Sequence, residues 1–324
     1  MKKYVVFCLA VIALLMGSCK NEDISISREV TFDVNPYEVI SGFVPNEYLT
    51  GDLESLPTGW KLRVHVLVYD QKGDLVDSEI RYLDDYNSTM NASFELADGQ
   101  YIVVATSDAV KYNGGVTFEY WEFSGKDRLS DFQITDGTYY NTDGRKILGA
   151  GNKKFILGAG QTTFHIDMEP QGALVFELVR GLHEYDEITA FELLMNKRPN
   201  TVSFSNDGST NIYVTDLTSM YWHLCEFDPE NFSSLHGYGY EFLLPTGRTN
   251  FVWNTQWADG SSMELTDVMT LEVGSGKMYQ FVLDMENLTS YYGEMGDKSI
   301  PSFRSESMSR MSSDPEAVVK NIEK

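Results

Sequence analysis

Hydrophobic and polar residues alternate with a period of two along most of this chain. In Leu62–Tyr69 every second residue from Leu62 to Val68 is a leucine or a valine. Successive side chains of a β-strand point to opposite faces of its sheet, so this pattern predicts a strand with one face in a core. The same pattern, bounded by turn residues, predicts further strands at Glu29–Val34, Asp74–Tyr82, Phe94–Leu96, Tyr101–Thr106, Phe132–Thr135, Lys154–Leu157 and Thr163–Met168.

A second series of alternating segments begins after Pro170. It predicts strands at Leu174–Val179, Ile188–Met195, Thr201–Ser205, Asn211–Thr215, Tyr221–Phe227, Tyr240–Leu244, Thr249–Trp257, Met263–Leu265, Met269–Val273 and Met278–Met285. Helical periodicity is scarce, and the best candidate for a helix is the short segment Gly125–Ser130. The pattern therefore predicts an all-β fold.

Turns that contain glycine separate many of these strands. Asp70–Gly73 is one, and Asp98-Gly99 predicts a hairpin in which the glycine can take a positive φ. Asn206–Gly208 and Ala258–Gly260 are turn signals in the second series. Gly274–Lys277 superficially matches a phosphate-binding loop but lacks its spacing and its hydroxyl residue, so we interpret it as a hairpin turn.

Two runs of strands, each more than a hundred residues long, predict two β-sandwiches in tandem. The N-terminal sandwich is expected at 29–168 and the C-terminal sandwich at 169–292, with the junction near Met168–Gly172. Pro170 cannot donate a backbone hydrogen bond to a ladder, so one strand should end there and another begin.

Residues 293–324 differ from both series. Ser302–Ser313 is rich in serine, methionine, arginine and glutamate and shows little periodicity. Asp314–Ile322 has the pattern of a short helix, but a polar tail is the interpretation that we favour.

The first residues have the features of a secretory signal peptide. Lys2 and Lys3 precede an apolar run, Tyr4–Met16, and small residues follow it up to Cys19. The run is shorter than the roughly 20 apolar residues that a membrane-spanning helix needs. Because a cysteine follows the expected cleavage position, residues 1–18 resemble a bacterial lipoprotein signal peptide. This resemblance implies that Cys19 becomes the first mature residue and carries the lipid. The acyl chains of that lipid are expected to include palmitate. The alternative is an ordinary signal peptide that happens to end near a cysteine.

The segment 19–28 is expected to be a linker. Within it Lys20–Asp23 is polar and acidic, and it resembles the tag that sends Bacteroidetes lipoproteins to the outer face of the outer membrane. The alternative is a solvated linker, in which such residues are common. Arg28 is the only arginine between Cys19 and the first strand, which makes it a candidate protease site. The simpler interpretation of Arg28 is a solvated linker charge.

The net charge argues against nucleic-acid partners, and the cysteine count argues against an intramolecular disulfide. Cleavage after residue 18 leaves 306 of the 324 residues, and loss of Lys2 and Lys3 changes the formal net charge from −23 to −25. A strongly acidic chain repels nucleic-acid phosphates and anionic lipid headgroups, so charge-driven binding to either is not expected. Cys8 leaves with the signal peptide and Cys19 is expected to be lipidated, so Cys225 has no partner for a disulfide. We interpret Cys225 as a core residue rather than as a nucleophile assisted by His223.

No set of residues predicts catalysis or a cofactor. His165 and Asp167 share one face of a strand, but two ligands without a third are a weak sign of a metal site. Asp136-Gly137 and Asp143-Gly144 lack the ligand spacing of a calcium loop, so we interpret them as turns. Some aromatic residues could stack against sugars, although half of each adjacent pair is expected to be core. These residues are Tyr120, Trp121, Tyr221, Trp222, Trp253 and Trp257.

Several segments carry a resemblance when they are taken together. After the leader and the strand at Glu29–Val34, Leu62–Asp70 is followed by Gly73-Asp74-Leu75-Val76. Asp98–Ala105 comes next, and the stretch from Phe164 to Leu194 spans the predicted junction. Across residues 1–290 this pattern resembles the Bacteroidetes fimbrillin superfamily, and within it the FimB-type fimbrial anchor lipoproteins.

The resemblance implies two transthyretin-like, Greek-key β-sandwiches and a structural, non-enzymatic role in a surface fimbria. In that family a strand of one subunit fills a groove in the next, and anchor members stay lipidated and hold the base of the fibre. The expected partners are therefore fimbrillin-like subunits and, through the lipid on Cys19, the outer membrane. Tip and stalk roles stay open. The rival hypotheses are a glycan-binding surface lipoprotein, which exposed coplanar aromatic residues would favour, and an enzyme, for which no catalytic set is present.

Overall fold

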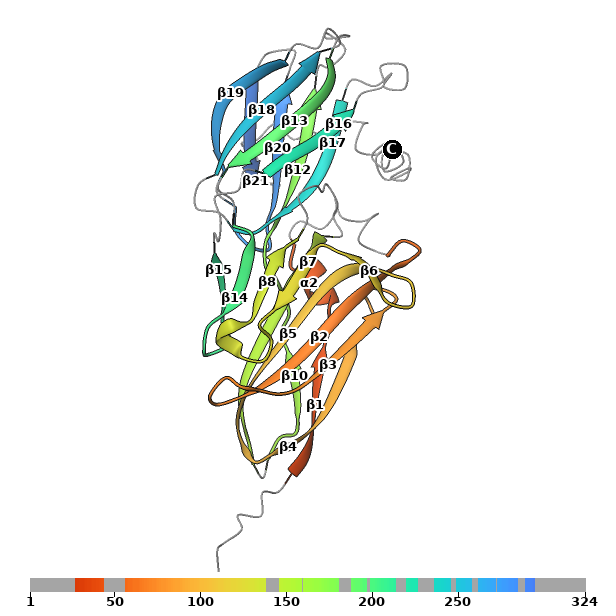
Figure 1. The fold of residues 1–324 in the computed structure, drawn as a ribbon, viewed down its shortest axis with the longest axis vertical. Helices are drawn as coiled ribbons and strands as arrows, with labels where there is room; N and C mark the ends of the chain where they lie inside the picture. Colours follow the sequence, from red (N-terminus) through yellow and green to blue (C-terminus); the bar gives the residue numbers. More distant parts are fainter. Residues whose placement is uncertain are drawn as a thin grey trace, which may run out of the picture.

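The structure is a computed structural model that describes most of the chain after residue 26. The described residues are 27–43, 56–137, 146–158, 160–180, 188–196, 199–213, 220–226, 236–245, 249–257, 262–271, 273–284 and 289–294. Their regular structure is almost entirely β-strand, which confirms the predicted all-β fold (Figure 1). Within these residues no helix has the length and apolarity needed to cross a membrane.

The first half of the chain forms a sandwich of two sheets, which we call the inner and the central sheet. The inner sheet has the order β10-β1-β4, from β1 (Ser27–Val34), β4 (Met90–Ala97) and β10 (Thr163–Ile166). The central sheet has the order β11-β9-β5-β2-β3, and β6 also pairs with β5. Its strands are β2 (Trp60–Asp70), β3 (Leu75–Leu83), β5 (Gly99–Tyr112), β6 (Val116–Glu119), β9 (Gly149–Leu157) and β11 (Glu169–Pro170).

A third sheet, the outer sheet, covers the other face of the central sheet. It has the order β15-β14-β8-β7, from β7 (Trp121–Ser124), β8 (Gln133–Asp136), β14 (Thr201–Phe204) and β15 (Thr210–Tyr213). The ring of Phe123 lies 6.4 Å from that of His65, and a Cβ on Gly208 would lie 2.8 Å from the side chain of Ile102. The central sheet is thus covered on both faces, which explains why every residue of β5 from 101 to 110 is buried.

The outer sheet joins segments from both halves of the chain. β14 and β15 follow the predicted junction, yet β14 pairs with β8, with Val202 opposite Ile134. The chain therefore leaves the first set of sheets after β11, returns to it for β14 and β15, and leaves it again after β15. A cut near Met168–Gly172 would separate β14 from its partner strand.

The remaining strands form the distal lobe, which lies at the opposite end of the molecule from the start of β1 (Figure 1). One sheet has the order β17-β12-β20-β21, from β12 (Ala173–Arg180), β17 (His236–Leu243), β20 (Met278–Asp284) and β21 (Thr289–Glu294). The other has the order β16-β13-β18-β19, from β13 (Ile188–Asn196), β16 (Met220–Glu226), β18 (Thr249–Trp257) and β19 (Ser262–Leu271). Trp121 and Phe242 meet edge to face at 6.1 Å, so the core continues into the base of this lobe.

Two of the predicted turns are confirmed as hairpin turns. Gly73, with φ of 83°, closes the turn from β2 to β3, and its N–H donates to the carbonyl of Asp70 at 2.9 Å. Gly208, with φ of 86°, closes the turn between β14 and β15 in the same way, through the carbonyl of Ser205. Only glycine adopts these angles without strain. The turn predicted at Ala258–Gly260 lies outside the described residues.

The hairpin predicted at Asp98-Gly99 is wrong. β4 pairs with β1 in the inner sheet, whereas β5 pairs with β2 and β9 in the central sheet, so the chain crosses the sandwich at this point. Gly274–Lys277 likewise lies between β19 and β20, which belong to different sheets. It is a turn but not a hairpin turn, and the N–H of Gly276 donates to the carbonyl of Gly172 at 2.9 Å.

The helix predicted at Gly125–Ser130 is also wrong. Only Leu129–Asp131 is helical there, as a single 3-10 turn (η2), and Gly125 has a left-handed φ of 64° that ends any helix. Among the described residues the α-helix is the short α2 (Tyr37–Ser41), which buries Val39 and Ile40. Five residues are too few to show a helical period in the sequence.

Candidate functional site

β1 is the first strand of the described chain and occupies the middle of the inner sheet. Eight of its residues pair antiparallel with β4, from Ser27 opposite Ala97 to Val34 opposite Met90. Its second half pairs parallel with β10. Ser27 is the eighth residue after Cys19, the predicted lipid-attachment residue, which lies outside the described residues. The strand that follows the predicted anchor is therefore paired with β4 along its whole length and with β10 along its second half.

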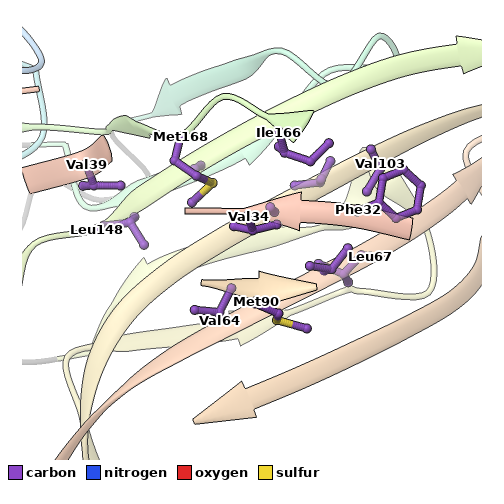
Figure 2. Packing of buried hydrophobic residues seen from close by; sticks show 14 of the residues in the cluster. Phe32, Val34, Val39, Val64, Leu67, Met90, Val103, Leu148, Ile166 and Met168 are labelled. Atoms are coloured by element: carbon purple, nitrogen blue, oxygen red, sulfur yellow. The ribbon is translucent and has the colours of Figure 1, made fainter. Parts of the chain in front are cut away.

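The inward side chains of β1 are part of the core. Val30, Phe32 and Val34 are fully buried, and Figure 2 shows the last two within the buried cluster that includes Met90 and Ile166. The ring centroid of Phe32 lies 5.4 to 6.0 Å from those of Phe94, Phe155 and Phe164. Because each fully buried side chain of this size contributes about 1.5–3 kcal/mol, β1 is held by its side chains as well as by its ladders.

Arg28 ties the N-terminal end of β1 to the chain at the end of β4. Its Nε lies 2.8 Å from Oδ1 of Asp98, at the crossing from β4 to β5. The hydrogen bond from Arg28 lowers the pKa of Asp98 below its ordinary value. Arg28 sits inside β1 opposite Leu96, so a protease would reach it only after the first pairs of the ladder open. Cleavage at Arg28 stays a prediction.

His165 closes the upper end of β1. Its Nδ1 lies 3.1 Å from Oδ2 of Asp33, and its Nε2 lies 2.8 Å from Oε1 of Glu38 at the start of α2. The second oxygen of Glu38 accepts the N–H of Met168 at 2.9 Å. Partial burial lowers the pKa of His165, but the hydrogen bond to Asp33 and the charge of Glu38 outweigh it, so the net shift is upward. Asp167 is farther away, with Oδ1 3.8 Å from Nε2.

Of the two residues considered as metal ligands, His165 is hydrogen-bonded to the carboxylates of Asp33 and Glu38, and Asp167 lies farther from its ring. In the part of the chain that the structure describes, no group of three or more His, Cys, Asp or Glu residues is arranged to hold a metal ion. The arrangement acts instead as a set of charge-assisted hydrogen bonds between β1, α2 and β10.

A buried ionic cluster lies where the central sheet meets the β6–β7 segment, and sequence reasoning missed it. The guanidinium of Arg63 donates to both carboxylate oxygens of Asp108, at 2.9 and 2.8 Å, and also binds Glu119 and the carbonyl of Trp121. Asp108 is fully buried, and burial raises its pKa to about 6 against the opposing effect of Arg63. In the sequence, Arg63 fits the polar half of an alternating strand, so no signal marked it as buried.

A second buried ion pair involves one of the predicted turn residues. Nζ of Lys146 lies 2.9 Å from Oδ2 of Asp136, and both side chains are fully buried. The indole N–H of Trp121 donates to the carbonyl of Lys146 at 2.8 Å. Asp136 is therefore the last residue of β8, and it carries a charge that is buried in the core. The other predicted turn, Asp143-Gly144, lies outside the described residues.

The structure describes two of the six aromatic side chains that were considered for stacking against sugars. Tyr120 and Trp121 are both buried, so this pair is core. The side chains of Tyr221, Trp222, Trp253 and Trp257 lie outside the described part, as do those of Cys225 and His223. A different aromatic group, the corner cluster, consists of Trp60, Phe118 and Tyr120, with ring centroids 4.9 to 6.0 Å apart. Phe118 of this cluster is 38% exposed.

Comparison with known proteins gives a likeness in fold and none in sequence. No protein-family model matches the chain, and no curated protein matches it. Among solved structures, a protein described as an adhesin candidate from Bacteroides thetaiotaomicron has a TM-score of 0.49 at 15% identity, covering 84% of this chain and 97% of that one.

Two further solved structures have names that refer to fimbriae. The fimbrial anchor protein Mfa2 from Porphyromonas gingivalis has a TM-score of 0.45 at 12% identity, covering 84% of this chain and 98% of its own. A fimbrial assembly protein from Parabacteroides distasonis has a TM-score of 0.44 at 11% identity, covering 83% and 95%. By the names that they carry, these structural neighbours are Bacteroidetes fimbrial proteins and adhesin candidates.

Proposed function

We propose that this chain is a lipid-anchored, non-enzymatic structural subunit of a surface fimbria. Cys19 carries the lipid at the outer membrane, and the distal lobe receives a fimbrillin-like partner by strand addition. The leader and the family-like strand pattern of the sequence support this role. The solved structures of similar fold are described as fimbrial anchor, fimbrial assembly and adhesin proteins, which is the same class of surface function.

One structural observation carries the proposal. β1 begins eight residues after Cys19, pairs with β4 along its whole length and pairs with β10 from Thr31 onward. A lipid on Cys19 is therefore joined by a short segment to a strand that two neighbouring strands hold within the inner sheet. This is the connection that an anchor subunit requires.

The same observation favours a partner site at the other end of the molecule. β1 already fills the middle of the inner sheet, so that sheet has no central gap for a foreign strand. Of the outermost strands described in the distal lobe, β16 and β17 contact each other, which leaves β19 and β21 as edges. An edge strand presents unpaired N–H and C=O groups that an extended partner strand can bind. A partner at this end points away from the membrane.

Substitution of Cys19 tests the anchor. Stable membrane anchoring takes more than one acyl chain, and in this proposal all of the acyl chains are attached at Cys19. Loss of Cys19 should therefore release the protein from the membrane. Cys19→Ala is expected to abolish incorporation of labelled palmitate and to leave the chain unprocessed or in the soluble fraction. Ser18→Ala, a small residue on the leader side, is the matched control and should keep both properties. Palmitate incorporation into Cys19→Ala, with unchanged membrane fractionation, would refute the anchor.

Deletion of the gene tests the fimbrial role. The expected phenotype is fimbriae that assemble but shed into the medium or grow to abnormal length. Normal, cell-attached fimbriae in the deletion strain would count against the role. Complementation with the wild-type gene, and with Cys19→Ala in parallel, separates loss of the protein from loss of its lipid.

The corner cluster is the observation that favours the glycan-binding alternative. Phe118 exposes part of its ring beside Trp60, and aromatic faces of this kind can stack on sugars. Tyr120 of the same cluster is buried, and Trp60 stacks on it with an interplanar angle of 18°, which occupies one face of the indole. Isothermal titration against host and dietary glycans, with Phe118→Ala as the matched variant, decides this alternative.

A further inference from the structure

β1 is placed to transmit tension. This inference rests on the proposed function, because it assumes that Cys19 is held at a membrane while a partner pulls on the distal lobe. Figure 1 shows β1 beginning at the end of the molecule remote from the distal lobe and running toward the waist along the long axis. A pull between these two ends therefore acts along β1 and across its ladder hydrogen bonds.

The direction of the pull decides how the ladders share the force. Hydrogen bonds between strands lie across the strand axis, so a pull along the strand strains all of them together. For β1 these are the bonds of eight residue pairs with β4 and of four pairs with β10. A pull away from the sheet would instead open the pairs one after another from Ser27. The first geometry resists far more force than the second.

The sequence of β1 also opposes sliding. Because side chains alternate with a period of two, a slide by two residues is the smallest that keeps Val30, Phe32 and Val34 facing the core. Such a slide toward Cys19 would bring Pro36 into the ladder position of Val34. Proline has no N–H, so the ladder would lose a donor at that position. A smaller valine would also replace the phenylalanine that fits among three other phenylalanine rings.

α2 follows β1 after two residues and blocks a longer slide. It is fixed by the bonds of Glu38 to His165 and to the N–H of Met168. Gly42 at its end is packed so closely that a Cβ there would lie 2.9 Å from Pro170. β4 and β10 each lie about 4.8 Å from β1, so the slot between their backbones is about 9.6 Å wide, and a helix with its side chains is about 10–12 Å wide. α2 therefore has to lose the bonds of Glu38 and unfold before β1 can slide farther through this slot.

We propose that β1 and α2 form a mechanical clamp that carries tension between the membrane anchor and the fibre. β1 resists by shear of its two ladders, and α2 is the stop that prevents the strand from sliding out toward Cys19. The Arg28–Asp98 and His165–Asp33 contacts fasten the two ends of the strand to its neighbours.

Single-molecule force spectroscopy on residues 19–324 tests the clamp. The unlipidated Cys19 thiol holds one handle, Cys225→Ser removes the other thiol, and Asp259→Cys between β18 and β19 holds the second handle. The control geometry places the second handle at Gly160→Cys instead. Gly160 comes three residues before Thr163, which pairs with Thr31 of β1, and a side chain added at Gly160 meets open space. This control pulls β1 away from the sheet from its first residue. The length of chain released in each event identifies the detachment of β1.

The expected result is a detachment force for β1 that is severalfold higher in the first geometry than in the control. Glu38→Gln should lower the force in the first geometry only, and the exposed Glu29→Gln on β1 should change neither. Equal forces in the two geometries would overturn the clamp and leave lipid anchoring intact. An unchanged force in Glu38→Gln would overturn α2 as the stop. Conversely, a Cys19 that is never lipidated in cells would overturn the anchor without altering these forces.

Discussion

The ion pair between Arg63 and Asp108 allows a quantitative test of how the central sheet is held. Asp108 is fully buried, and Arg63 binds both of its carboxylate oxygens. Asp108→Ala would leave the Arg63 charge in the core, which costs about 3–5 kcal/mol when no other partner is present. Glu119 also binds Arg63 and offsets part of this charge. We therefore expect a loss of about 3 kcal/mol in the free energy of unfolding.

The double variant separates the charge from the packing. Arg63→Met with Asp108→Leu removes both charges and keeps apolar volume, so its stability should lie within about 1 kcal/mol of wild type. Urea unfolding, followed by circular dichroism, measures the free energy of unfolding of wild type, of Arg63→Met, of Asp108→Leu and of the double variant, with Asp108→Ala measured beside them. Arg81→Met, in an exposed pair with Glu79, is the matched control and should change stability by about 0–1 kcal/mol. Single losses below about 1 kcal/mol, or a double loss equal to their sum, would refute the reasoning.

The remaining predictions concern β1, the turn of the outer sheet and two histidines. Phe32→Ala should cost about 3–5 kcal/mol in urea unfolding, because the ring is fully buried, and Thr31→Ala, at a half-buried position, should cost far less. Gly208→Ala should destabilise the chain and alter the β14–β15 hairpin in amide exchange, because its φ is 86° and its Cβ would lie 2.8 Å from Ile102. Full retention of stability there would contradict the packing of the hairpin on the central sheet. The pKa of His165 is raised, so its stabilising effect is full below about pH 6.5 and is lost as pH rises through the raised value. The stability difference between wild type and His165→Gln should therefore shrink toward alkaline pH, and a constant difference would contradict it. The pKa of His65 is lowered to about 3 by burial and by the charges of Lys126 and Arg63, so its effect has the opposite sign. Wild type should lose up to about 1.4 kcal/mol per pH unit below about pH 6.5 relative to His65→Gln, and a flat profile would contradict this.

The alternating pattern predicted strands well where one face of a strand is buried. β4 shows this alternation, because its residues are buried and exposed in turn from Met90 to Leu96, although the prediction covered only Phe94–Leu96. The pattern underestimated β5, which extends to Tyr112, because burial on both faces removes the alternation. Asp108 within that strand gave no warning of a core charge, since an acidic residue in a strand usually marks the solvent face.

Connections between strands could not be predicted from local sequence. Asp98-Gly99 has the residues of a hairpin turn, but the same two residues serve a chain that crosses to the opposite sheet. The pairing of β14 with β8 joins residues that are more than sixty positions apart, and nothing in either segment specifies the other. For the same reason the bonds of His165 to Asp33 and Glu38, which fix the end of β1, were not predictable.

Site-specific photo-crosslinking on intact cells tests the central claim most directly. A photoreactive residue at Glu264 on β19, an edge of the distal lobe, is compared with one at Glu79 on β3, an edge of the central sheet. Each strand can offer backbone groups to a partner, but only β19 lies in the distal lobe, at the end remote from the start of β1. The account predicts that the probe on β19 captures a fimbrial subunit and that the probe on β3 does not. Capture by β3 alone, or by neither probe in fimbriated cells, would contradict a fimbrial anchor that receives its partner at the distal lobe.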